Sequence, residues 1–234
     1  MVKTNAAVIV LPYRMWPPDW AKYKFEFLTL FKLLFYKKSR TVAIIMGVEI
    51  NMEHIANLLF EVRILKDIVR SGYAFLGSGK ETIAEHSFMT AFICFAMARM
   101  NPEVDGEKLV AMALVHDIAE ARTGDLNYVE RHYCETDEGK ALFHLTRHIP
   151  FGHEIKSLVD EFNLGESEES RLAHDADQIS FILELKKLMD TGVKGPEKWL
   201  PIILGRLMTQ TGQKMGEAIL KTGWDEWWMN DYSE

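Results

Sequence analysis

From residue 52 onward, apolar residues recur every three or four positions, and this spacing is the feature that most restricts the fold. The first apolar face consists of Ile55, Leu58, Leu59, Val62, Leu65, Ile68 and Val69. Such spacing is typical of amphipathic helices, and no run of alternating β-branched residues is long enough to predict a sheet. We therefore predict an all-α fold, with a single compact helical bundle over residues 47–234.

Cap and turn residues divide this bundle into separate helices. Pro102 disfavours helical geometry in the residue before it, and Ser167 is a suitable N-cap for a long helix. The predicted helical segments are one that ends before Gly72, residues 82–100, residues 106–122, two shorter helices within 126–165, residues 167–190, and a final section that opens at Gly195.

Residues 1–46 differ from the rest of the chain in their charge. They contain 8 of the 27 Lys and Arg residues but only 2 of the 34 Asp and Glu residues, which leaves 19 basic and 32 acidic residues in 47–234. The stretch Phe25–Tyr36 is apolar but interrupted by Glu26 and Lys32, a pattern typical of a basic amphipathic segment that touches a membrane surface or a partner. We predict an N-terminal extension, either disordered or an interaction arm.

Composition excludes several classes of protein. The net charge of −7 argues against a nucleic-acid polymer as partner, because polymer binding uses clustered Lys and Arg, whereas a small anionic ligand remains compatible. Cys94 and Cys134 are the only cysteines, so neither a disulfide framework nor a thiolate metal cluster is predicted. No stretch of about 18 apolar residues would span a bilayer. We predict a cytoplasmic protein without a transmembrane segment.

The dipeptide His116-Asp117 is the sharpest chemical signal. It lies in AMALVHDIAE, residues 111–120, where most neighbours are apolar. An ionised carboxylate in apolar surroundings is costly to desolvate unless a cation or hydrogen-bond donors meet it. A metal ion beside the helix could be reached by both side chains, and a buried, hydrogen-bonded His-Asp pair is the alternative.

Two further residues are predicted to complete a metal site. His86 begins a strongly apolar helix, and Asp177 precedes another apolar run. Two imidazoles and two carboxylates suit one divalent transition metal ion, either Mn, Co, Fe, Ni or Zn. Asp175 is the rival to Asp177 as fourth ligand. His144 and His148 are a second candidate pair, which we interpret as solvated because no embedded carboxylate accompanies them.

These motifs resemble those of the HD-domain metal-dependent phosphohydrolase superfamily. Within it, the chain is similar to the bacterial 5'-deoxynucleotidases and to the branch named HD domain-containing protein 2. The matching stretches are RSGY at 70–73, ETIAEHS at 81–87, ALVHDIAEA at 113–121, GDL at 124–126 and AD at 176–177.

The resemblance implies a helical bundle with a metal site between helices, a nucleotide substrate and a homodimer. It also implies a role for each matching residue. The implied metal ligands are His86, His116, Asp117 and Asp177. The implied catalytic residues are Glu120, for proton transfer, and Asp125, as a second acid. The implied substrate-binding residues are Arg70 at the phosphate, Glu81, and Asp125 at the sugar.

The activity predicted on this basis is phosphate release from (deoxy)nucleoside 5'-monophosphates by metal-activated water. Ser71 follows Arg70 where the bacterial deoxynucleotidases carry tryptophan, so selectivity for deoxy sugars does not follow from the resemblance. Two alternatives remain open. One is another HD-domain hydrolase, acting on nucleoside triphosphates or guanosine tetraphosphate, and the other is a catalytically weak nucleotide-sensing or scaffold protein.

Overall fold

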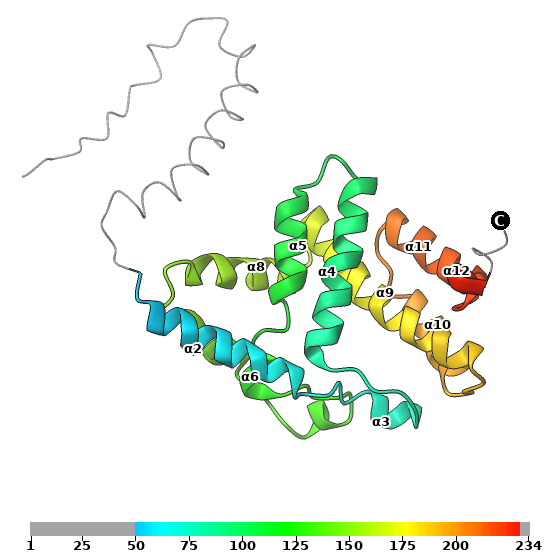
Figure 1. Cartoon of the computed structure of the whole chain (residues 1–234), viewed down its shortest axis with the longest axis horizontal. Helices are drawn as coiled ribbons and strands as arrows, with labels where there is room; N and C mark the ends of the chain where they lie inside the picture. The colour runs from blue at the N-terminus through cyan, green and yellow to red at the C-terminus, as the bar shows by residue number, and fades with distance from the viewer. Residues whose placement is uncertain (1–49, 230–234) are drawn as a thin grey trace, which may run out of the picture. The chain divides into compact units, whose positions relative to one another are not determined.

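The computed structural model describes residues 50–229, so the predicted extension over 1–46 lies outside the described residues. The described part of the chain is helical, with an isolated bridge between Val69 and Thr82 as its β pairing, and the all-α prediction is confirmed (Figure 1). The helices are α2 (Met52–Arg63), η3 (Ile64–Lys66), α3 (Tyr73–Leu76), α4 (Ile83–Met100), α5 (Gly106–Val115), α6 (Glu120–Thr123), η4 (Glu130–His132), α7 (Glu138–Thr146), α8 (Gly152–Leu164), α9 (Glu168–Asp190), α10 (Pro196–Leu204), α11 (Gln210–Lys221) and α12 (Glu226–Met229).

Three helices form the centre of the core. α4 and α5 pack against each other, and both pack against α9, with Met97, Met112 and Ile179 fully buried among them. α10 and α11 also pack on α9, while α8 contacts α5, α7 and α9. Because α4, α5 and α9 are in mutual contact, residues from distant parts of the sequence meet where they adjoin. None of the helices in residues 50–229 combines the length and hydrophobicity needed to cross a bilayer.

The starts of the two longest helices follow from their capping residues. The Thr82 side chain accepts a hydrogen bond from the Glu85 backbone N–H, and the Glu85 carboxylate accepts one from the Thr82 backbone N–H. This reciprocal capping box satisfies two N–H groups that a helix start leaves unpaired. The Ser167 hydroxyl accepts from the Ser170 N–H at the start of α9 in the same way. Both predicted starts are confirmed.

Two predicted helices are wrong at their C-terminal ends. The first does not continue to residue 71, because α2 ends at Arg63 and Val69 pairs with Thr82 in the isolated bridge. The second does not continue to residue 122, because α5 ends at Val115. After it, the Ile118 N–H donates to the Val115 carbonyl and the Glu120 N–H to the Asp117 carbonyl, each spanning three residues rather than four. The apolar spacing runs through this tightened turn, so periodicity could not reveal it.

Candidate metal centre

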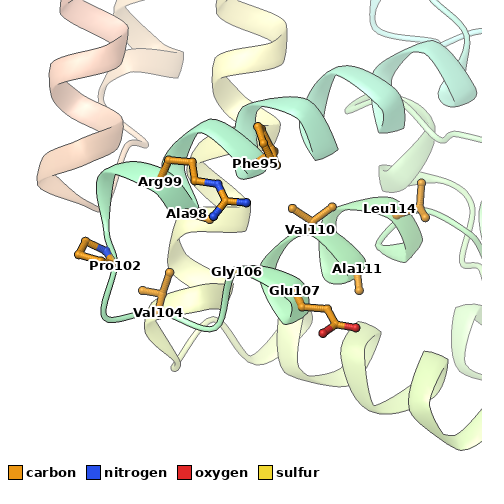
Figure 2. A pocket seen from close by; sticks show the side chains of 10 residues that line it. All are labelled: Phe95, Ala98, Arg99, Pro102, Val104, Gly106, Glu107, Val110, Ala111 and Leu114. Atoms are coloured by element: carbon orange, nitrogen blue, oxygen red, sulfur yellow. The ribbon is translucent and has the colours of Figure 1, made fainter.

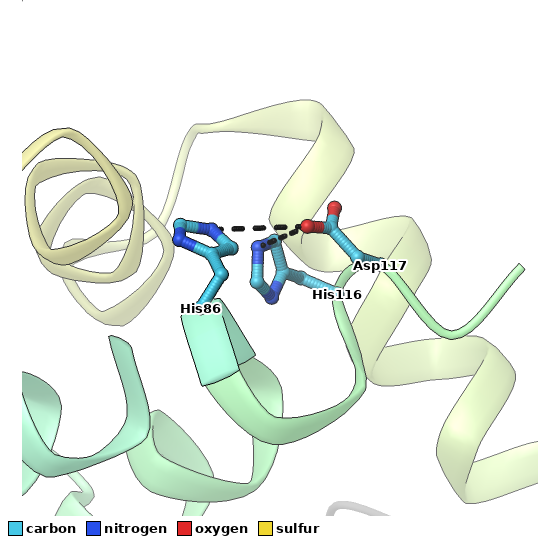
Figure 3. Close-up of side chains that lie close together, drawn as sticks. All are labelled: His86, His116 and Asp117. Atoms are coloured by element: carbon cyan, nitrogen blue, oxygen red, sulfur yellow. Dashed lines mark ion pairs between the residues drawn. The ribbon is translucent and has the colours of Figure 1, made fainter. Parts of the chain in front are cut away.

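The predicted ligands come together from three elements. His86 lies in the first turns of α4, His116 and Asp117 directly follow α5, and Asp177 lies within α9. One ligand atom from each of His86, His116 and Asp117 lies within 4.8 Å of the others, and residues 50–229 contain no other such group of three (Figure 3). His86 is fully buried and His116 is 7% exposed. The sequence prediction therefore corresponds to one compact cluster.

The distances within the cluster are short. Nε2 of His116 lies 3.0 Å from Oδ2 of Asp117, and Nε2 of His86 lies 3.8 Å from the same oxygen. Oδ1 of Asp177 lies 3.0 Å from Nε2 of His86. Asp177 is thus next to the group of three, on the side of His86. The amide of Gln178 donates to the other Asp177 oxygen at 2.8 Å.

The hydrogen bonding of His116 shows whether these residues could hold a metal ion. Its Nδ1 lies 2.8 Å from the Ala113 carbonyl oxygen, which can only accept, so Nδ1 carries the proton. In a neutral ring, Nε2 then presents a lone pair toward the Asp117 carboxylate. This Nε2 atom is buried and has no hydrogen-bond partner. Two lone pairs facing each other at this range repel unless a proton or a cation lies between them, and the donor set fits a divalent cation.

The pKa values of these side chains also indicate that the site requires a positive charge. Burial lowers the pKa of His116, but the Asp117 carboxylate outweighs this effect and raises the pKa to about 9. Burial would raise the pKa of Asp177, yet its hydrogen bond with His86 and the charge of Arg70 hold it well below its usual value. Both carboxylates are therefore ionised in a mostly buried site, and a proton on His116 compensates them where no metal does.

Glu120 and Arg70 border the cluster. Burial, followed by repulsion from Asp117 and Asp125, raises the pKa of Glu120 to about 9. Nη1 of Arg70 lies 3.8 Å from Oδ1 of Asp177. Oε2 of Glu120 and Nη1 of Arg70 are both buried without a hydrogen-bond partner, so each has capacity for a further polar group.

Asp125 is held in place by Ser71. The Ser71 N–H and hydroxyl donate to Oδ2 of Asp125 at 2.7 and 3.1 Å. Gly124, which precedes Asp125, has φ of 72° and so adopts a conformation that side chains disfavour. It ends α6 and turns the chain so that Asp125 and Arg70 line one pocket of about 350 Å³.

Glu81 lies behind Arg70. It is 5% exposed, its Oε2 accepts a hydrogen bond from the Tyr73 hydroxyl at 3.3 Å, and the same oxygen lies 3.9 Å from Nε of Arg70. The Arg70 backbone N–H also donates to the Glu81 carbonyl. Glu81 therefore lies next to Arg70 through both its side chain and its backbone.

Asp175, the rival ligand, has all its contacts elsewhere. Its Oδ1 accepts from the Met208 N–H at 2.7 Å, and its Oδ2 accepts from the Thr209 N–H at 2.8 Å and the Thr209 hydroxyl at 2.6 Å. A Cβ on Gly212 would lie 2.2 Å from the Asp175 carboxylate, which explains a glycine there. Asp175 therefore anchors the start of α11. The ring of His148 lies against that of His54, with centroids 5.1 Å apart and planes inclined by 32°, and His148 belongs to no cluster of three metal-ligating side chains among the described residues.

Sequence reasoning missed several residues of the site. Gln178 adjoins a predicted ligand, and its position after Asp177 was the available signal. The pocket beside the cluster is also lined by Arg131, Phe181, Trp199 and Arg206. Arg131 lies among polar residues, which do not distinguish it from a solvated arginine. Arg206 lies between the apolar residues Leu204 and Leu207, and this contrast was the available signal.

Comparison with known proteins identifies the family. The family model described as HD domain matches residues 62–218, which is more than half of the chain. The chain belongs to the HD-domain family. The resemblance inferred from the motifs is thereby confirmed, and His116-Asp117 lies within the matched range.

Curated relatives are similar in sequence to part of this chain. The 5'-deoxynucleotidase HDDC2 of Mus musculus is 26% identical over 132 residues, covering 54% of this chain and 65% of the relative. The 5'-deoxynucleotidase hdd1 of Schizosaccharomyces pombe is 28% identical over 131 residues, covering 52% of this chain and 65% of the relative. The match thus spans just under two thirds of either relative.

Solved structures share the fold. A conserved hypothetical protein from Pyrococcus furiosus superimposes with a TM-score of 0.61 at 26% identity, covering 71% of this chain and 99% of that chain. A predicted metal-dependent phosphohydrolase from Magnetospirillum magnetotacticum gives a TM-score of 0.58 at 23% identity, covering 73% and 91%. These similarities show that the fold is shared.

Proposed function

We propose that this protein is a metal-dependent phosphohydrolase that releases phosphate from (deoxy)nucleoside 5'-monophosphates. His86, His116, Asp117 and Asp177 are the proposed ligands of one divalent ion. The observation that carries the proposal is the buried Nε2 of His116 facing the Asp117 carboxylate at 3.0 Å with no hydrogen-bond partner. The names of the mouse and fission yeast relatives support the substrate class.

Each bordering residue has a proposed task. A divalent ion bound here would supply Lewis acidity, which acidifies water and polarises a phosphate oxygen. Arg70 binds the phosphate through charge-assisted hydrogen bonds, and Glu81 holds its guanidinium in orientation. A divalent cation bound beside it would lower the pKa of Glu120, so that its carboxylate could accept the proton of the attacking water, whose oxygen bonds to phosphorus as the bond to the 5' oxygen breaks. Asp125, fixed by Ser71, contacts the sugar.

Phosphate release from metal-free and metal-reloaded protein tests this proposal. The chelated protein should be inactive, and added Mn²⁺, Co²⁺, Fe²⁺, Ni²⁺ or Zn²⁺ should restore activity to an extent that ranks the metals. Orthophosphate from monophosphates supports the proposal, tripolyphosphate from triphosphates favours the rival hydrolase, and no release from any nucleotide favours the sensing or scaffold protein.

A matched pair of aspartate variants locates the site. Asp117→Ala should lose activity by about 100-fold or more, because even loss of a residue behind a metal ligand costs roughly 10- to 100-fold. Asp160→Ala makes the same change at an exposed ion pair with Lys156 and should retain activity. Equal activity of the two variants would contradict the proposed ligand set.

We also propose that the protein is a homodimer through the outer face of α4. Phe88, Phe92 and Phe95 are 65%, 59% and 46% exposed and follow one another along this helix. Beside them is a hollow of about 770 Å³, with Arg99 and Glu107 on its walls (Figure 2). Neither charge forms an ion pair within the described residues. A twofold interface on this face would let Arg99 of each copy pair with Glu107 of the other, which would make the surface complementary to itself.

Light scattering after size exclusion tests the dimer. The wild-type protein should have the mass of two chains, and Phe92→Glu should have the mass of one. Phe143→Glu is the matched control, because Phe143 is 52% exposed on α7, away from this face. A monomeric wild-type protein would contradict the proposal.

Two further proposals concern domain organisation and compartment. We propose that residues 47–234 form one phosphohydrolase domain and that residues 1–46 are an extension, so a chain starting at Gly47 should retain its melting temperature and activity. We propose a cytoplasmic location, supported by Cys94 and Cys134, which are both free thiols. Fractionation of cells that express the full chain tests the location.

A further inference from the structure

The pocket beside the metal cluster has a charge opposite to that of its surroundings. Three arginines, Arg70, Arg131 and Arg206, line it together with one carboxylate, that of Asp125. Residues 47–234 as a whole carry 19 basic and 32 acidic residues. A cationic pocket in an acidic domain attracts anionic ligands locally while the rest of the surface does not.

Two of these charges have no assigned partner. Arg70 is close to Asp177 and Glu81, and Oδ2 of Asp125 already accepts two hydrogen bonds from Ser71. Nε of Arg131 donates to the Leu126 carbonyl at 2.8 Å, which fixes the guanidinium and leaves its terminal nitrogens without a protein partner in residues 50–229. Arg206, just after α10, forms no ion pair in the described part of the chain. These two arginines therefore have donors for a group outside the protein.

The rest of the wall is aromatic. Phe181 meets Tyr73 edge to face with centroids 6.1 Å apart, and it meets Trp199 in the same way at 5.9 Å. All three rings line the pocket. Aromatic side chains fixed by one another form a rigid apolar surface suited to a nucleobase. The pocket thus combines a surface for a base with cations for more than one anionic group.

We propose that this pocket selects nucleotides that carry a second phosphate on the sugar, such as nucleoside 3',5'- or 2',5'-bisphosphates. The inference rests on the proposed function and narrows its substrate class. Arg70 is the arginine that lies beside a proposed metal ligand, whereas Arg131 and Arg206 come from segments that contribute none. A 5'-diphosphate places its extra charge next to the reacting phosphate, while a phosphate on the sugar places it at a distance from the metal.

The reaction is the same hydrolysis at the 5' position. The oxygen of water bonds to phosphorus and its proton passes to Glu120, the bond to the 5' oxygen breaks, and that oxygen takes the proton from Glu120. The products of a 3',5'-bisphosphate are therefore orthophosphate and a nucleoside 3'-phosphate. The second phosphate stays intact and serves to bind Arg131 and Arg206.

The test compares kcat/KM for adenosine 3',5'-bisphosphate, 2',5'-bisphosphate, 5'-diphosphate and 5'-monophosphate on the metal-loaded enzyme. A 3',5'- or 2',5'-bisphosphate should exceed the monophosphate by about tenfold or more, since one charge-assisted hydrogen bond is worth about that factor. Arg131→Gln and Arg206→Gln should each reduce this ratio. Arg147→Gln removes the same charge from an exposed arginine outside the pocket and should leave the ratio unchanged.

Calorimetric binding to chelated protein separates failure of the inference from failure of the proposed function. The bisphosphate should bind more tightly than the monophosphate, and each pocket variant should reduce this difference. Arginine-dependent binding without hydrolysis of any nucleotide would support the pocket and reject the hydrolase. The inference would be overturned, and the hydrolase retained, if the protein hydrolysed the monophosphate and its kcat/KM for the bisphosphate equalled that for the monophosphate in wild type and variants. A preference for the 5'-diphosphate would also overturn it.

Discussion

The exchange of Asp175 for asparagine separates a carboxylate that holds the fold from one that holds a metal. In the wild type, three donors from Met208 and Thr209 meet the two Asp175 oxygens at 2.6 to 2.8 Å. Asparagine has a single acceptor oxygen. If this oxygen accepts both bonds from Thr209, the amide group faces the Met208 N–H, and one backbone donor loses its partner.

The magnitude follows from these contacts. A buried donor without a partner costs about 1–3 kcal/mol, and two remaining bonds lose their charge assistance, so we expect a loss of about 3 kcal/mol in the free energy of unfolding. For a domain of this size, each kcal/mol lowers the melting temperature by about 2–4 °C, so Asp175→Asn should melt roughly 6–12 °C lower.

Thermal melts in chelator, paired with metal content by mass spectrometry, measure both effects. Asp175→Asn should melt early and still bind metal below its melting temperature. Asp177→Asn is the matched change two residues away, and it should lose metal with a smaller change in melting temperature. The reasoning is refuted if Asp175→Asn melts like the wild type and loses its metal.

The other predictions concern the acid groups and the ion. Glu120→Gln should lower kcat by about 10²- to 10⁴-fold with unchanged metal content, and a loss below tenfold would remove Glu120 from proton transfer. Burial raises the pKa of Glu81 to about 7 from 4.5, so the folded state binds more protons between these values and its stability falls as pH rises through this window, by up to about 3 kcal/mol. Urea unfolding in chelator measures the free energy of unfolding of Glu81→Gln minus that of the wild type. This difference should be more favourable to the variant at pH 8 than at pH 5, and a difference independent of pH would contradict the reasoning. Metal at about 100 times its dissociation constant should add about 2.7 kcal/mol to the stability of the wild type and nothing to that of Asp117→Ala, as thermal shifts can show.

The sequence predicted those parts of the fold that depend on neighbouring residues. Thr82 and Ser167 are local signals, because each cap contacts a backbone N–H three residues away. The end of α5 was not predictable in this way, since the residues after Val115 keep both their apolar spacing and a helical backbone at His116, with φ of −56° and ψ of −41°. Only the hydrogen-bonding pattern distinguishes the tightened turn from a continuing helix.

In the candidate site, too, the residues with local sequence signals were predictable and those that depend on long-range packing were not. His86, His116 and Asp117 could be nominated from the sequence, because polar residues in apolar surroundings require compensation. The choice between Asp175 and Asp177 could not be derived from the residues alone, since both lie in one short stretch of α9 and differ in which helices they face. The contribution of Arg131 and Arg206 depends on how α10 and the segment around η4 meet across the pocket, which is long-range packing.

The tightened turn after α5 has a consequence for chains that vary in length. His116, Asp117 and Glu120 lie within five consecutive residues of this turn. The local backbone therefore sets the distances between them, and the packing of one helix against another does not. In a related chain with one extra residue between Asp117 and Glu120, the His-Asp pair would keep its place but the glutamate would point away from it. Such a chain would bind a metal ion and would not hydrolyse a substrate.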